Sequence, residues 1–334
     1  MNVLIYGGCH AEVIRRSLEK YALGEHKFQK IVNFSLIASR VSFPYDILKN
    51  IDLVVFNPIH NKGEWNTLHL EEYCFVNGVR LIKYPWLQWG GYWPHAAQRR
   101  WGDVKEWSIP LIRKESEKYE SISENYCSIF NEGVISQAAS GWLDKTTQFL
   151  RDAEKRGSVD ISIVDWVYGR YKEKRLFQTP DHPCTELYKY VIGNIASAAG
   201  LTLDKSFFHI SAELQPGVMT PILPNVASAL HLNFTGGEWR HDEIWGDSEL
   251  TLRDFVDSHF RKSPLLLGKA IVKTVRKDIL GKRAIVPAGK KFLLEKMPNN
   301  SVRHHHLCNI RLADGGAQQS LLYKPHWAYF EPEF

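Results

Sequence analysis

Three polar segments of the sequence each follow an apolar run, and together they carry a thiol, imidazoles, amides and a phenol. They are YGGCH at residues 6–10, NPIHN at 57–61 and WLQWGGYWPH at 86–95. Cys9 stands just before a segment whose apolar residues recur at helical spacing. A thiol at a helix start lies at the positive end of the helix dipole, which lowers its pKa. The sequence therefore predicts an activated Cys9 nucleophile; the competing interpretation is a small apolar residue that fills space.

The groups around Cys9 suit acid–base chemistry and anion binding. His10 and His60 are candidate bases for a nucleophile at this position, and His95 is a further imidazole. Gly7 and Gly8 allow a tight turn and leave backbone N–H groups open to an oxyanion or a phosphate. The segment is not a dinucleotide fingerprint, because Glu12 stands where that motif needs a glycine.

The first hundred residues alternate strand and helix patterns, and these elements must position the polar segments. The apolar runs predict strands over 2–6, 30–38, 51–57 and 79–85, with helices over 11–23 and 64–78. Such alternation is typical of a parallel, Rossmann-like α/β sheet with helices packed on its faces. Since the loops after the carboxyl ends of parallel strands line one crevice, we expect the three segments to converge there.

Beyond this part the pattern changes twice. Long helical patterns from about residue 102 predict a helical lobe packed on the sheet, and strand patterns from about 265 predict a small β appendage. The expected domains are therefore 1–101 with the Cys9 turn, 102–264, and 265–334, the last of unknown role.

A fourth polar segment, QTPDHPC at 178–184, precedes the helical pattern that ends at Gly200. Asp181 or Thr179 can cap a helix that Pro183 opens at its first turn. His182 would then lie beside a helix start, where the neutral imidazole is favoured and can accept a proton. The sequence predicts that His182 serves the same site as Cys9; a plain capping loop is the alternative.

Composition and net charge limit the classes of ligand that the chain is expected to bind. The chain of 334 residues has a formal net charge of +5 and a pI near 8.8, which suits anionic ligands more than nucleic acid. Arg99 and Arg100 are the candidates for pairing with a phosphate, unless they are a solvated helix start. The five cysteines show no CxxC spacing, so the sequence predicts no metal site and a reduced, cytoplasmic protein.

Taken together, these segments resemble the WcbI-like family of polysaccharide-biosynthesis acetyltransferases over about residues 1–235. That family opens with a GNCQ turn after a strand, where this chain has GGCH; a later GYxP segment corresponds to GYWP at 91–94, and an HP turn to His182-Pro183. The resemblance implies coenzyme A as the cofactor, Cys9 as the family cysteine, and an acetyl group passed to a capsule sugar. The replacement of the amide pair of GNCQ is the departure nearest to the site.

The expected function is therefore transfer of an acetyl group from acetyl-CoA to a hydroxyl of a capsular or surface polysaccharide or its precursor, by a protein able to associate with the inner face of the membrane. Cys9 either carries the acetyl group as a thioester or only lines the site while His10, His60 or His182 acts as the base. The expected coenzyme A contacts come from the polar segments and from the basic pair, and they are Gly7, Gly8, Asn57, Tyr92, His95, Arg99 and Arg100. The alternatives are a Cys/His-type acyl hydrolase and a non-catalytic module that stacks glycan or nucleotide on its tryptophans.

Overall fold

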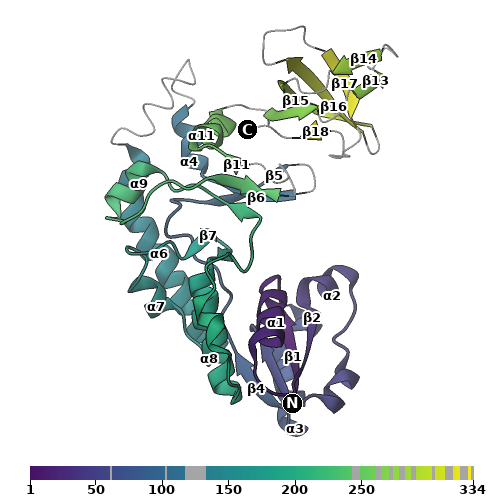
Figure 1. Cartoon of the computed structure of the whole chain (residues 1–334), viewed down its shortest axis with the longest axis vertical. Coiled ribbons are helices and arrows are strands. Elements are labelled where there is room, and N and C mark those ends of the chain that lie inside the picture. The colour runs from purple at the N-terminus through teal and green to yellow at the C-terminus, as the bar shows by residue number, and fades with distance from the viewer. Residues whose placement is uncertain are drawn as a thin grey trace. The chain divides into compact units, whose positions relative to one another are not determined.

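The computed structural model describes residues 1–60, 62–101, 104–116, 133–242 and 249–260, and the strands between 265 and 331 (Figure 1). The chain forms two compact units. The first unit comprises Met1–Gly91, Gly141–Pro216 and His231–Phe234, and the second comprises Tyr92–Ser140, Gly217–Leu230 and Thr235–Phe334. Each unit therefore draws on more than one of the segments expected from the sequence.

The first unit is built on a four-stranded parallel sheet, as predicted. Its strands are β1 (Asn2–Gly7), β2 (Lys27–Val32), β3 (Leu53–Phe56) and β4 (Arg80–Lys83), in the order β2-β1-β3-β4. The chain steps outward from β1 to β2 and then crosses back to β3, so the direction of winding reverses between β1 and β3. In doubly wound sheets, the crevice at such a reversal, outside the carboxyl ends of the strands, is where ligands bind.

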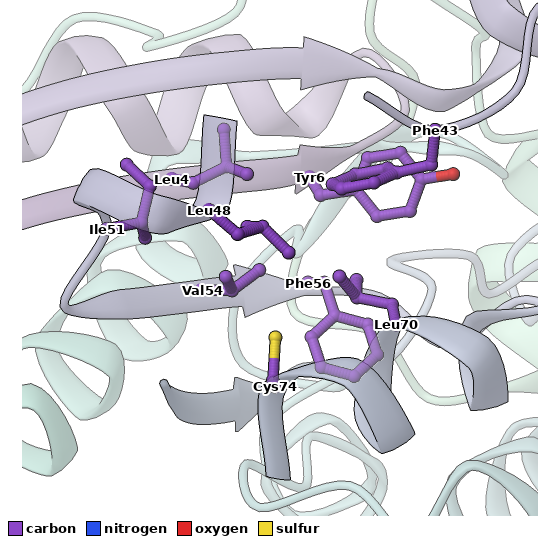
Figure 2. Packing of buried hydrophobic residues seen from close by; sticks show 9 residues of the cluster. All are labelled: Leu4, Tyr6, Phe43, Leu48, Ile51, Val54, Phe56, Leu70 and Cys74. Atoms are coloured by element: carbon purple, nitrogen blue, oxygen red, sulfur yellow. The ribbon is translucent and has the colours of Figure 1, made fainter. Parts of the chain in front are cut away.

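One face of this sheet carries a compact apolar core. Leu4 and Tyr6 of β1 and Val54 and Phe56 of β3 point toward it, because alternate residues of a strand share a face. Figure 2 shows how they pack against side chains from α3 (Thr67–Val76), from the 3-10 helix η1 (Tyr45–Asn50) and from the adjoining chain; these are Phe43, Leu48, Ile51, Leu70 and Cys74. The core holds the ends of β1 and β3 at a common edge.

Two longer helices support the sheet from within the first unit. α1 (His10–Tyr21) starts directly after β1 and packs on β1 and β2. α8 (Thr185–Ala199) lies against α1 and β4 (Figure 1), and the guanidinium of Arg80 donates to the carbonyls of Ala198 and Ala199 at its end. α8 therefore reaches the sheet although it lies more than a hundred residues further along the chain.

The remaining elements of the first unit are short, apart from most of one long helix. They are α2 (Asn33–Ser39), η2 (Gly63–Trp65), α6 (Val134–Gly157), α7 (Val164–Tyr168), η3 (Lys205–His209) and a hairpin of β7 (Phe177–Thr179) and β8 (His182–Pro183). This hairpin carries the predicted HP turn and leads straight into α8.

The second unit combines small antiparallel sheets with short helices. Its N-terminal elements are the hairpin of β5 (Ala97–Trp101) and β6 (Val104–Ser108), α4 (Pro110–Ser116) and the first residues of α6. Next come β9 (Val218–Met219), α9 (Pro224–Ala229), β10 (Trp239–His241), β11 (Glu249–Leu250) and α11 (Leu252–Phe260), with the strands ordered β11-β10-β9.

The C-terminal part of the chain forms the expected β-rich appendage. Five of its strands form one sheet in the order β17-β16-β15-β12-β18, and two more pair as β13-β14. The bounds are β12 Leu265–Ala270, β13 Thr274–Lys277, β14 Arg283–Val286, β15 Lys291–Val302, β16 His305–Leu312, β17 Gln319–Tyr323 and β18 Phe330–Glu331.

Three predicted elements differ from the structure. The strand expected over 30–38 ends at Val32, and the apolar residues after it form α2, since a short apolar run fits either element. Residues 104–108 form β6 instead of a helix, paired with β5. α8 begins at Thr185, so Pro183 lies outside it, and Glu213 rather than Thr179 or Asp181 accepts the Thr185 N–H at 2.8 Å.

No helix within the described part of the chain has the length and apolar character needed to cross a membrane.

Truncating Phe56 tests the shared core of β1, β3 and α3. Its ring is fully buried (0% exposed), so we expect Phe56→Ala to lower the free energy of unfolding by about 3–5 kcal/mol in chemical denaturation. The matched control is Phe75→Ala in α3, where the ring is 88% exposed and a change within about 0.5 kcal/mol is expected. Equal losses for the two variants would contradict the packing in Figure 2.

Candidate active site

The carboxyl ends of three strands meet around Gly7, the last residue of β1. Asn57 and Tyr84 extend the strand pairing by one residue each, since the N–H of Asn57 donates to Tyr6 O at 3.4 Å and that of Tyr84 to Phe56 O at 2.9 Å. A Cβ on Gly7 would lie 2.4 Å from the Tyr84 hydroxyl and 2.8 Å from Asn57 Oδ1. The glycine is therefore what allows these two polar side chains to approach the strand end.

Cys9 is the N-cap residue of α1, as its place in the sequence suggested, and it is exposed. Its pKa is nevertheless raised, not lowered. Loss of hydration around the sulfur is the largest cause and the carboxylate of Asp181 the next; hydrogen bonds from Gln215 and from backbone N–H groups act the other way. The expected lowering is wrong because two non-local effects outweigh the start of the helix.

His10 is a buried, neutral imidazole. It is 2% exposed, and burial, followed by repulsion from His182, lowers its pKa to about 3. Its Nδ1 lies 2.8 Å from the hydroxyl of Tyr188, which comes from α8. Its Nε2 is buried without a hydrogen-bond partner among the described residues. With so low a pKa, His10 is a poor proton acceptor for a substrate at neutral pH.

Tyr188 connects His10 to Gln215. The Tyr188 hydroxyl donates to Gln215 Oε1, and Gln215 is among the groups that act to lower the pKa of Cys9. Tyr188 is fully buried, and its pKa is raised well above the ordinary value, first by burial and then by Cys9. The turn after β1, the middle of α8 and the 213–215 loop therefore meet at one point.

The β7–β8 hairpin contributes a histidine with an orienting carboxylate. His182 Nδ1 lies 3.0 Å from Asp181 Oδ1 and 2.9 Å from Thr179 Oγ1, and the Thr179 hydroxyl donates to the same carboxylate oxygen at 2.8 Å. Because Nδ1 is held by this pair, Nε2 is the nitrogen left for proton transfer. Both side chains act electrostatically on the Cys9 turn, since Asp181 raises the pKa of Cys9 and His182 lowers that of His10.

Three further polar groups near the strand ends are buried without partners within the described ranges. They are Asn57 Nδ2, His60 Nε2 and the Tyr84 hydroxyl, and Asn57 and Tyr84 are only 2% and 1% exposed. Burial, and after it Cys9, raises the pKa of Tyr84. Buried polar groups are rarely left unpaired, so the unpaired groups of Asn57 and Tyr84, two side chains that both approach Gly7, are typical of a functional site.

The remaining residues of the predicted polar segments and the basic pair lie in different environments. Trp86 lies against Gly8 and edge-on to His10, with 42% of its surface exposed. Tyr92, His95 and the backbone of Arg99 and Arg100 belong to the second unit; Tyr92 is buried, His95 is exposed, and the arginines lie on β5, not on a helix. Their contact with a ligand stays a prediction.

Sequence reasoning missed Tyr84, Tyr188 and Gln215. Tyr84 could have been found, since it follows β4 directly and so satisfies the strand-end rule that selected Cys9 and Asn57. Tyr188 is one of several buried residues on α8, and Gln215 stands in an irregular loop. Neither carries a local signal, because only the tertiary fold brings them to Cys9.

With this geometry in place, comparison with known proteins gives a family. A family model for the polysaccharide biosynthesis enzyme WcbI matches residues 2–204, which is more than half of the chain. The chain belongs to the WcbI family. The resemblance seen in the sequence is thereby confirmed, and the enzyme class named for the family is polysaccharide biosynthesis.

A solved WcbI structure shares the fold. It matches at a TM-score of 0.58 with 15% sequence identity, and the alignment covers 78% of this chain and 88% of that one. That structure is described as the native protein without a disulfide bond between coenzyme A and one of its cysteines. No curated protein matches this chain. At such low identity, the likeness to WcbI supports the α/β fold alone.

Substituting Gly7 tests the close approach at the end of β1 in this WcbI-family chain. We expect Gly7→Ala to cost about 1–3 kcal/mol of unfolding free energy, because its Cβ meets the Tyr84 hydroxyl. In the Tyr84→Phe background the cost should fall, giving a coupling above about 0.5 kcal/mol in a double-mutant cycle. As the control, Gly141→Ala in α6 has open space and should stabilise by about 0.5–1 kcal/mol. Additive losses would show that the hydroxyl is not the obstacle.

The raised pKa of Cys9 predicts its alkylation profile. The rate, followed residue by residue with mass spectrometry, should still rise with pH beyond the ordinary thiol range, since only the thiolate reacts. Asp181→Asn should shift the profile to lower pH by removing the nearby charge, whereas Asp165→Asn, at an exposed carboxylate paired with Arg151, should not. Cys74 and Cys184 are buried and should react more slowly. A plateau at neutral pH in the wild type would contradict the prediction.

Proposed function

We propose that this WcbI-family protein is a coenzyme A-dependent O-acetyltransferase acting on a hydroxyl of a capsular or surface polysaccharide or its precursor. One observation carries the proposal: the Asp181–His182 pair acts on the same turn as the exposed thiol of Cys9, at the strand ends where the winding of the sheet reverses. A thiol and an oriented imidazole at a ligand-binding edge suit acyl transfer better than simple binding.

The residues around Cys9 fit a thioester ligand. The buried Asn57 amide and Tyr84 hydroxyl are donors without partners in the described chain, and an acyl or phosphate oxygen would satisfy them. The indole of Trp86, which is 42% exposed, lies against Gly8 of the same turn and offers an apolar face to the non-polar part of a ligand or to a sugar ring. Acetyl-CoA, when bound, supplies the acyl group in activated form as a thioester.

The protonation states favour direct transfer over a covalent Cys9 intermediate. The raised pKa leaves Cys9 as a neutral thiol at neutral pH, a weaker nucleophile than a thiolate. His182 is the better base, because Asp181 holds its Nδ1 and leaves Nε2 to accept a proton. In the proposed step His182 Nε2 takes the proton of the sugar hydroxyl while the hydroxyl oxygen attacks the acyl carbon. The imidazole then returns the proton to the sulfur of coenzyme A as that sulfur leaves.

An acetyl-transfer assay with a polysaccharide precursor and labelled acetyl-CoA tests this mechanism. His182→Ala should lower turnover by about 10²–10⁴-fold while folding and coenzyme A binding persist, because a general base contributes about that much. Cys9→Ala should keep part of the activity, and intact mass should show no acetyl adduct on the wild type. His69→Ala, at an exposed histidine of α3, is the control and should leave turnover unchanged.

Other outcomes would assign other functions. Release of acetate at the same rate without any acceptor would indicate an acyl hydrolase. A stable acetyl adduct on Cys9 that passes to the acceptor would establish the covalent route, and full activity of His182→Ala would place the base elsewhere.

A further inference from the structure

Gly7, Asn57 and Tyr84 form a row across three neighbouring strands at the carboxyl edge of the sheet. Each comes directly after the last row that is paired across β1, β3 and β4, which consists of Tyr6, Phe56 and Lys83. Since side chains alternate along a strand, this row faces away from the apolar core that holds Tyr6 and Phe56. The Tyr84 hydroxyl and Asn57 Oδ1 lie 2.4 Å and 2.8 Å from the point where a Cβ on Gly7 would stand. The two polar side chains therefore converge on the end of β1.

We propose that Asn57 and Tyr84 together bind the acyl carbonyl oxygen of the thioester and stabilise the negative charge that this oxygen gains during transfer. The proposal rests on the acetyltransferase function above and gives the two side chains a catalytic role in it. Both have a donor to offer, because Asn57 Nδ2 and the Tyr84 hydroxyl are buried and have no partner within the described ranges. Their approach to a common point allows one oxygen atom to contact both.

The chemistry of the two donors favours an acyl oxygen over a phosphate. A buried phosphate would require cationic partners for its full negative charge, and neither Asn57 nor Tyr84 carries a charge. Tyr84 also keeps its proton at neutral pH, since burial, and after it Cys9, raises its pKa. An acyl oxygen is neutral before the reaction and becomes charged only in the transition state. Uncharged donors then bind it most strongly when the charge appears.

The two donors complement the base of the transfer step. As the sugar oxygen bonds to the acyl carbon, its proton passes to His182, and an electron pair of the C=O bond moves onto the acyl oxygen. There the amide of Asn57 and the hydroxyl of Tyr84 hold it. The pair returns to the C=O bond as the carbon–sulfur bond breaks, and the sulfur takes the proton from His182. Because both donors follow strands of one sheet, they are in place before the charge forms.

A comparison of acetyl-CoA with S-ethyl coenzyme A tests the site, because the second ligand has a CH₂ group where the first has C=O. By isothermal titration calorimetry, the wild type should bind acetyl-CoA about 3–10-fold more tightly, as expected for one net hydrogen bond. Tyr84→Phe and Asn57→Leu should each bring this Kd ratio close to one and leave the Kd of S-ethyl coenzyme A nearly unchanged. In the transfer assay, each should lower kcat by about 10²–10³-fold with a smaller change in KM.

Unfolding without ligand separates this role from a structural one. Tyr84→Phe removes a buried hydroxyl that has no partner in the described chain, so its midpoint of urea unfolding should be unchanged or higher. Tyr190→Phe is the matched control, since it removes a hydroxyl that donates to Ser162 O at 3.1 Å, on α8. This variant should keep the wild-type Kd ratio and kcat.

Three results would overturn the proposal. They are a wild-type Kd ratio in Tyr84→Phe, a clear loss of stability in that variant, and equal binding of the two ligands by the wild type. If Asn57→Leu does not fold, Tyr84→Phe alone decides. Equal binding would leave the transferase proposal intact, because coenzyme A would still be bound. If neither ligand binds, the transferase proposal itself fails, and the acyl-oxygen site fails with it.

Discussion

Strands β1 and β3 are parallel neighbours that end at the same edge of the sheet, and the winding of the chain reverses between them. The helix after β1 and the helix after β3 are thus directed to opposite faces, and the turn at Gly7 is left between them. Every polar group of the candidate site depends on this arrangement. Without a Cβ on Gly7, the side chains that follow β3 and β4 can approach the end of β1, two residues before the thiol at the start of α1.

The other part of the candidate site comes from segments far along the chain. The β7–β8 hairpin, α8 and the 213–215 loop form one hydrogen-bonded group, since Glu213 binds the start of α8 and Gln178 of β7 binds the carbonyl of Gln215. α8 also packs on α1, which brings Tyr188 to His10. The candidate site therefore combines the carboxyl edge of the sheet with this hydrogen-bonded group, and its geometry depends on the packing of α8 against α1.

The features predicted correctly are those that depend mainly on residues close together in the sequence. The parallel sheet, the helix after Cys9 and the polar strand ends followed from apolar periodicity, and the structure has them. The strand predicted over 30–38 and the helix predicted over 104–108 were wrong, because short apolar or mixed runs take their conformation from tertiary partners. Here the strand β2 ends early, and residues 104–108 pair with β5. The start of α8 was misplaced because its cap comes from Glu213, twenty-eight residues away.

The pKa of the Cys9 thiol shows most clearly the limit of a prediction made from local sequence. A helix start does favour a thiolate, but the loss of hydration around the sulfur and the Asp181 carboxylate both oppose it, and neither is visible in YGGCH. Tyr188 and Gln215 were missed for the same reason, since Tyr188 contacts His10 of α1 and Gln215 contacts Tyr188 only in the folded chain. A rule about one turn of helix holds only until the fold brings other charges near that turn.

Asp181 also links the two chemical groups of the site. The carboxylate that binds His182 Nδ1 is the one that disfavours a charged Cys9, so one side chain keeps the imidazole oriented and the thiol protonated. A thiolate beside that carboxylate would compete for the same proton that His182 must move. A neutral thiol does not, and it leaves His182 as the group that accepts the proton of an attacking hydroxyl. Environments that separate two titratable groups in this way assign their roles, here a base and a neutral neighbour.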